Sequence, residues 1–183
     1  FSMLIQALYN IVDSYFVGQY SNSGLTALSV IFPVQLIITA IAVGTGVGVN
    51  TYMARMYAFG KKRAADCTAG TGMVLAVISW AVFAVAMLLL MEPYVRTSAT
   101  SPDAVADAVL YGNIVCVGSL GIFLESIWTK VYQAGGNMRL PMLAQIAGAL
   151  TNIVLDPVLI FGLGPVPHMG IAGAAIATVA GQC

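Results

Sequence analysis

Residues 67–91 read CTAGTGMVLAVISWAVFAVAMLLLM, a run of 25 residues without a charged side chain. A helix needs about 20 apolar residues to cross the ~30 Å hydrocarbon core of a bilayer. Residues 24–54 form a second run that also carries no charge. Because lipid offers the backbone no hydrogen bonds, only helices and closed barrels cross it, and these runs are too long and too continuously apolar for the alternating strands of a barrel. The sequence therefore predicts an all-α, polytopic transmembrane helical bundle.

The overall composition supports this class and excludes others. Apolar residues make up 60% of the chain and charged residues 8%, with a mean hydropathy of +0.92. Ordinary soluble domains are about 25% charged. The net charge is zero, so no basic face is expected and nucleic acid is not an expected partner. The three cysteines lie far apart and form neither a metal-binding spacing nor a disulfide framework.

The apolar runs divide the chain into five spans and the start of a sixth. The apolar pattern is already under way at residue 1, so we expect a piece whose first and sixth spans are truncated. Pro33 lies inside the second run and predicts a bend there, because proline removes a backbone donor. The expected spans are about 1–18, 25–57, 66–91, 104–134, 140–163 and 169–183.

The basic residues predict the orientation. Counting crossings between the spans places six of the seven on one side of the membrane and leaves only Arg96 on the other. By the positive-inside rule the side with six is cytoplasmic. We expect a multi-pass plasma (inner) membrane protein whose loop at Lys61–Arg63 is cytoplasmic. The six residues are Arg55, Lys61, Lys62, Arg63, Lys130 and Arg139.

Two carboxylates, Asp13 and Asp156, lie inside apolar runs of different spans. A charged Asp at the centre of a membrane helix costs about 2.5–3.5 kcal/mol on insertion scales, so such residues usually serve a function. At ~1.5 Å per residue, both lie roughly 8–9 Å below the expected outer ends of their helices. Asn152 is one turn from Asp156, and Tyr111 and Thr178 come to comparable depths. We therefore expect one polar layer built from several helices.

Two nearby aspartates in low dielectric either bind a proton or coordinate a cation. The amide oxygen of Asn152 and the hydroxyl of Thr178 suit a hard cation that prefers oxygen ligands, so Na⁺ is possible at Asp13, Asn152, Asp156 and Thr178. Pro157 adds a local break beside its carboxylate, as in many transporter ion sites. The alternative is that each Asp only hydrogen-bonds a neighbouring helix in packing.

Glu125 is a separate candidate in the inner half of the fourth span, close to Lys130 in sequence. It either lines a cavity or anchors its helix at the inner boundary, and Asn10 is a further candidate for cavity lining. The sequence contains no Ser–His–Asp set, metal cluster or acid–base pair suited to hydrolysis, so an enzyme is not expected.

Several segments resemble one transporter family. The first is LYNIVDSYFVGQ at 8–19, which resembles the first-helix signature of the multidrug and toxic compound extrusion (MATE) transporters. Four further segments resemble later parts of the same family, in the same order along the chain. They are NTYMARMYAFGKKRAAD at 50–66, QAGGNMRLPM at 133–142, NIVLDPVLIFG at 152–162 and GIAGAAIATVAGQ at 170–182.

The resemblance implies a twelve-helix antiporter with two six-helix lobes around a central cavity. Residues 1–183 would be the N-terminal lobe, and the second lobe of the same protein is absent from this sequence. In the family, an Asp of the first helix forms a proton or cation site with an Asn and an Asp of the fifth, which match Asp13, Asn152 and Asp156. A Thr of the sixth helix matches Thr178, and a Tyr of the fourth matches Tyr111.

The leading hypothesis is an H⁺- or Na⁺-coupled antiporter that exports cationic or amphipathic drugs and toxins by alternating access. A flippase for a lipid-linked intermediate is an alternative, but phosphate needs positive partners and no Arg or Lys lies deep in a span. A membrane-embedded enzyme using the two acids is less favoured, and a non-transporting scaffold would be insensitive to ion gradients.

Overall fold

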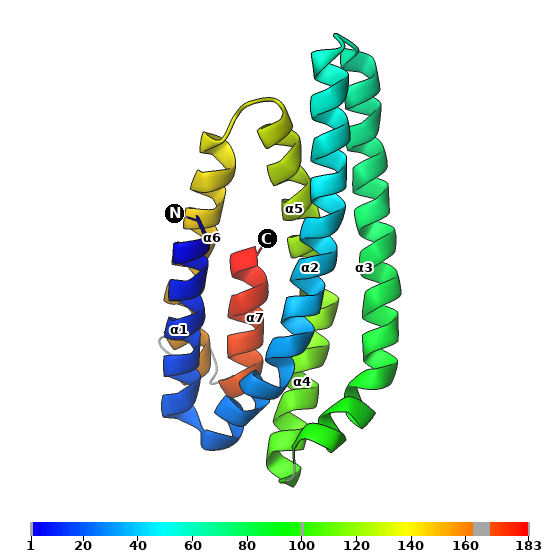
Figure 1. The fold of residues 1–183 in the computed structure, drawn as a ribbon. Coiled ribbons are helices and arrows are strands. Elements are labelled where there is room, and N and C mark those ends of the chain that lie inside the picture. Colours follow the sequence, from blue (N-terminus) through cyan, green and yellow to red (C-terminus); the bar gives the residue numbers. More distant parts are fainter. Residues whose placement is uncertain (1, 100, 163–168, 183) are drawn as a thin grey trace.

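The computed structural model describes residues 2–99, 101–162 and 169–182, and its regular structure there is entirely helical (Figure 1). This confirms the all-α prediction. The helices are α1 (Ser2–Tyr20), α2 (Asn22–Ala58), α3 (Lys62–Ser98), α4 (Pro102–Gly118), α5 (Leu120–Ala134), α6 (Arg139–Phe161) and α7 (Gly170–Gln182).

Four helical segments of the described chain are long and apolar enough to cross a membrane: α2, α3, the pair α4–α5, and α6. At 13 residues, α7 is about 20 Å long, shorter than a full crossing. The outermost helix, α3, exposes many large apolar side chains, among them Val82 and Leu89. Such a face suits lipid rather than water, so the chain is a multi-pass membrane protein.

The second helix begins three residues earlier than expected. The Ser21 side chain accepts hydrogen bonds from the backbone amides of Ser23 and Gly24, so it caps α2 and shortens the turn after α1. Pro33 lies within α2, and Figure 1 shows this helix changing direction in its N-terminal part. The bend agrees with the expectation from proline.

The span expected at 104–134 is confirmed as one apolar span over Pro102–Ala134, but it consists of two helices, α4 and α5, with a break at Ser119. Two side chains bond to carbonyls at this break: Ser119 Oγ donates to Cys116 O at 2.7 Å, and Trp80 Nε1 donates to Val117 O at 3.1 Å. Gly118, the last residue of α4, lies so close to Val179 that a Cβ there would collide with it. The break therefore depends on contacts from α3 and α7.

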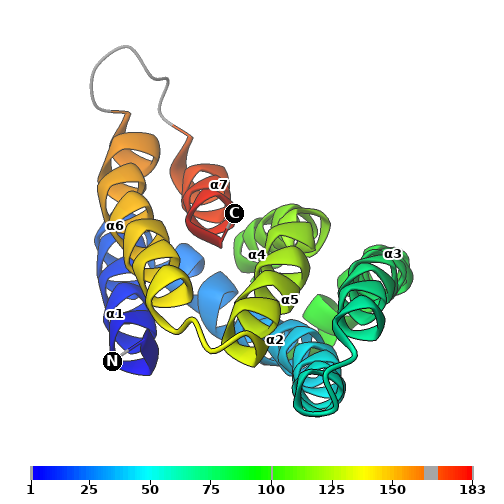
Figure 2. The same ribbon diagram turned by 90° about the horizontal axis from the view of Figure 1, so that it is seen from above.

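The helices form two groups that meet along α7. On one side α1 packs on α6 and α6 packs most extensively on α7; on the other, α2 packs against α3, α4 and α5 (Figure 2). Glycines bring α6 and α7 together, since a Cβ at Gly148 would collide with the Gly181 carbonyl and one at Gly181 would lie 2.7 Å from the Asn152 Cβ. Because of this close approach, Asn152 of α6 lies against α7.

Candidate functional site

The polar layer predicted from the sequence is buried in the bundle. Four of its residues are nearly inaccessible: Asp13 is 4% exposed, Asn152 2%, Asp156 0% and Thr178 4%. Tyr111, the fifth predicted residue, is 1% exposed. None of the five faces the outer surface of the bundle, where apolar side chains predominate.

The packing of α1, α4, α6 and α7 brings these five residues together. Asp13 and Asp156 are 143 positions apart in sequence but lie within electrostatic range of each other. Both carboxylates also lie within electrostatic range of the Tyr111 side chain. The Tyr111 hydroxyl also faces Thr178. Residues from the two groups of helices therefore share one polar layer around α7.

Hydrogen bonds satisfy only part of this layer. Asn152 Nδ2 donates weakly to Asp156 Oδ1 at 3.5 Å, one helical turn away. Gln35 Nε2 of α2 donates to the Tyr111 hydroxyl at 3.1 Å. Gln35 was missed by the sequence analysis, although an amide two residues after a helix proline in an uncharged span was a signal for it.

Six buried side-chain oxygens have no hydrogen-bond partner in the described part of the chain; two are on Asn113 and Gln182, and the other four belong to this layer. These four are Asp13 Oδ1, Asn152 Oδ1, Asp156 Oδ2 and Thr178 Oγ1. Burying a polar oxygen without a donor is unfavourable, and burying a carboxylate charge without a partner is more so. All four are hard oxygen ligands, so the set fits a proton or a hard monovalent cation such as Na⁺.

The same oxygen-only set does not fit a transition metal. No group of three or more His, Cys, Asp or Glu side chains gathers anywhere in the described residues. Soft or borderline metals favour sulfur and imidazole ligands, whereas hard cations take carboxylate, amide and hydroxyl oxygens. The ligand chemistry therefore favours the proton or Na⁺.

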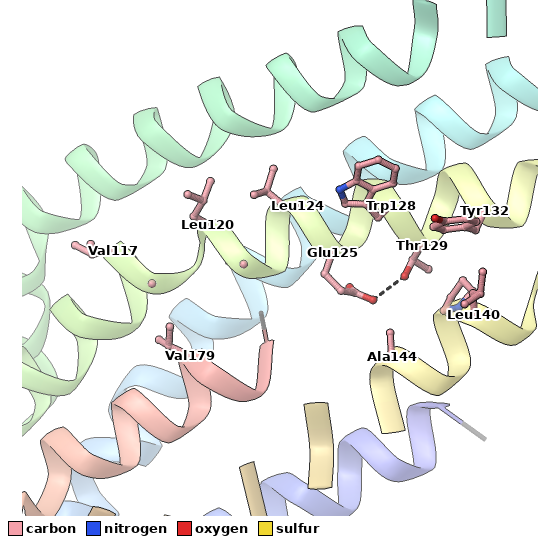
Figure 3. A pocket seen from close by; sticks show the side chains of 13 residues that line it. Val117, Leu120, Leu124, Glu125, Trp128, Thr129, Tyr132, Leu140, Ala144 and Val179 are labelled. Atoms are coloured by element: carbon pink, nitrogen blue, oxygen red, sulfur yellow. Dashed lines mark hydrogen bonds between the residues drawn. The ribbon is translucent and has the colours of Figure 1, made fainter. Parts of the chain in front are cut away.

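Glu125 lies apart from this layer, in a pocket of about 660 Å³ between α5, α6 and α7 (Figure 3). Its Oε1 accepts hydrogen bonds from Thr129 Oγ1 at 2.6 Å and Gln145 Nε2 at 3.3 Å. Lys130 does not pair with it, since Lys130 Nζ donates to Gln133 Oε1 at 3.0 Å. The half-buried carboxylate thus lines a cavity. Asn10 belongs to α1, and its side chain lies outside the described residues.

Carboxylates inside membrane helices often mark ion or substrate pathways, so the buried Asp13 and Asp156 in a multi-pass bundle indicate a membrane transport protein. Comparison with known proteins defines the class further. The MatE family model matches residues 1–158, and the chain belongs to this family of transporters.

Individual relatives agree with this assignment. The chain is 32% identical over 174 residues to a protein named FAD transporter from Shewanella oneidensis, and 24% identical over 177 residues to a probable multidrug resistance protein NorM from Thermotoga maritima. These alignments cover 93% and 96% of this chain and 38% of each relative. The chain therefore spans well under half the length of these curated relatives.

Solved structures show the same fold. A MOP superfamily transporter from Pyrococcus furiosus aligns with 99% of this chain at a TM-score of 0.90 and 31% sequence identity. The alignment covers 39% of that transporter's chain.

Proposed function

We propose that residues 1–183 form the N-terminal lobe of an antiporter that exports cationic or amphipathic compounds in exchange for H⁺ or Na⁺. The ion is taken up by Asp13, Asn152, Asp156 and Thr178. The observation that carries the proposal is that four of the six buried oxygens without a hydrogen-bond partner in the described chain lie on these four residues. A bound proton or cation supplies what they lack.

Coupling requires that the ion binds one conformation of the protein better than another. The layer joins α1, α6 and α7, which pack against one another, so an ion held between them adds a further link between these helices. Inward movement of the ion then favours the conformation in which these helices are closest. In that conformation the substrate is released outward.

Three further elements belong to this proposal. The second lobe of the same protein completes the transport path, in keeping with the 38% share of the relatives that this chain covers. The protein resides in the plasma (inner) membrane, and its loop at Lys61–Arg63 is cytoplasmic. The α2–α3 and α5–α6 connections, which lie at the same end of the bundle, support that orientation because their basic residues then share one side (Figure 1).

Flavin dinucleotide export is a second candidate, favoured by the name of the Shewanella relative. The pyrophosphate of FAD needs positive partners, such as Arg, Lys or the N-terminus of a helix. No basic residue is among those described as lining the Glu125 pocket. Charge therefore favours an organic cation as the substrate of this lobe, and the same argument weighs against a lipid-linked phosphate.

The full-length protein in proteoliposomes tests the proposal. Export of a cationic dye is measured with the H⁺ gradient and the Na⁺ gradient collapsed in turn, for the wild type and for Asp13→Asn and Asp156→Asn. Both variants keep the size of the side chain and remove its charge, and each should lower ion-driven export by about tenfold or more. Glu92→Gln, at an exposed ion pair, is the matched control.

Two outcomes contradict the proposal. Export at the wild-type rate by both aspartate variants rejects the coupling role of the layer. Export of FAD but not of the dye by the wild type rejects the cationic substrate.

A further inference from the structure

The Glu125 pocket occupies a different place in the lobe from the polar layer. Glu125 is nine residues before the end of α5, roughly 14 Å from the end of the bundle that carries the α5–α6 connection. Asp156 is five residues before the end of α6, roughly 8 Å from the opposite end. The two carboxylates, Glu125 and Asp156, therefore lie in opposite halves of the bundle.

The chemistry of the pocket is that of a site for an organic cation. Glu125, Trp128, Thr129 and Tyr132 follow one another at spacings of three, one and three along α5, and all line the cavity. Leu124 and Leu140 add apolar surface to the walls. A volume of about 660 Å³ lies within the range of pockets for drug-sized molecules.

The carboxylate of Glu125 is held in place while one of its oxygens stays available. Both of its hydrogen bonds, from Thr129 and Gln145, go to Oε1. Figure 3 shows the side chain directed away from α5 toward α6, next to Ala144. The rings of Trp128 and Tyr132 lie 6.1 Å apart at 31°, so they form one aromatic wall, and aromatic faces attract cations.

We propose that this pocket binds the exported compound as a monovalent organic cation with an aromatic or otherwise apolar body, and that Glu125 is the residue that selects positive charge. The inference rests on the proposed export function and adds a substrate site separate from the ion layer. It also gives the two sites a physical link, because Thr178 belongs to the layer and the next residue of α7, Val179, lines the pocket.

The link has a direct consequence. Gly118 packs against Val179 so closely that it leaves no room for a side chain, so a displacement of α7 at the ion layer also displaces one wall of the pocket. Ion and substrate then affect each other's affinity without sharing a ligand.

The test is a binding measurement on the purified full-length transporter, without any ion gradient. Tetraphenylphosphonium is the probe, since it carries a permanent single charge inside an aromatic shell, and triphenylphosphine oxide is the neutral counterpart. Dissociation constants are measured by equilibrium dialysis for the wild type, Glu125→Gln, Glu125→Asp, Trp128→Leu, Asp156→Asn and the control Glu92→Gln.

The wild type should bind tetraphenylphosphonium, and Glu125→Gln should weaken that binding by about tenfold or more while leaving binding of the neutral compound unchanged. Glu125→Asp should remain within about threefold of the wild type because it retains the charge. Trp128→Leu should weaken binding by about two- to fivefold through loss of an aromatic face. Melting temperatures of all variants show that each one is folded.

Three outcomes overturn the inference. One is unchanged binding of the cation to Glu125→Gln. Another is the absence of binding to the wild type. The third is a loss in Asp156→Asn as large as that in Glu125→Gln, which assigns the cation to the ion layer. Failure of the proposed ion coupling gives a different result. The dissociation constants for tetraphenylphosphonium stay as expected, but Asp13→Asn and Asp156→Asn export at the wild-type rate.

Discussion

The helical bundle contains carboxylates in two contrasting settings. Asp156 is fully buried, receives one weak hydrogen bond at 3.5 Å and retains an oxygen without a donor. Glu125 is half-buried, accepts two hydrogen bonds and faces a cavity. The same chemical group is thus found in two environments, and we propose that they suit two different partners. A carboxylate without donors needs a small ion to complete it, whereas a supported carboxylate beside an open space can receive a large partner.

The largest expected effect comes from the packing that encloses the first setting. In Gly148→Ala the new methyl group collides with the Gly181 backbone carbonyl, which cannot rotate away, so α6 and α7 must separate. We expect a loss of about 2–3 kcal/mol in stability and loss of ion-driven export, because Asn152 and Asp156 move away from Thr178. Thermal melting and dye efflux of the full-length protein measure both.

Gly44→Ala is the matched control, since no atom lies within 4 Å of a Cβ added there. It should leave export unchanged and raise stability by up to about 1 kcal/mol, because alanine favours the helix over glycine. Equal melting temperatures for the two variants would show that the α6–α7 contact does not hold the layer together.

The next prediction concerns whether the two aspartates form one site. If Asp13 and Asp156 share one ion, removing the second charge after the first should change little. The double variant Asp13→Asn/Asp156→Asn should therefore export within about threefold of the weaker single variant, far from the product of the two losses. Efflux rates of the four proteins form the double-mutant cycle. If the double variant instead lost export by the product of the two single losses, Asp13 and Asp156 would be independent sites. The contrast between one shared ion layer and the Glu125 pocket would then not hold.

A smaller effect is expected at the edge of the layer. Tyr111→Phe removes the hydroxyl that accepts from Gln35 and faces Thr178, while keeping the buried ring. Export should fall by about three- to tenfold and stability by about 1–2 kcal/mol, because the Gln35 amide loses its acceptor. Tyr15→Phe is the control, since its hydroxyl accepts only an exposed hydrogen bond from Gln19. Equal export by both variants would exclude Tyr111 from the layer.

Much of this arrangement was visible in the sequence because membrane insertion penalises charge so strongly. Asp13 and Asp156 stood out within uncharged runs, and helix length alone placed them at similar depth. Asn152 followed from the spacing of one turn. The role of these residues in ion coupling stays a prediction, whereas their burial and convergence are features of the structure.

What sequence spacing did not show depends on contacts between distant segments. The break at Ser119 involves Trp80 of α3 and Val179 of α7, so no local pattern within 104–134 announces it. Gln35 reaches Tyr111 across 76 positions, and Gln145 reaches Glu125 across 20. An amide in an apolar helix is easily noticed, but its partner is fixed only by how the helices pack.

The smallest expected effect concerns a carboxylate outside both settings. Glu92 and Arg96 form an ion pair at 2.6 Å, one turn apart near the end of α3, with side chains 62% and 68% exposed. Water and salt screen such a pair, so Glu92→Gln should change stability by less than about 0.5 kcal/mol and leave both export and cation binding at wild-type levels. Melting temperature at low and high salt, together with the efflux and dialysis assays, measures this. If Glu92→Gln matched the losses of Asp156→Asn or Glu125→Gln, removal of any negative charge would be enough to impair transport, and burial would not be what distinguishes these carboxylates.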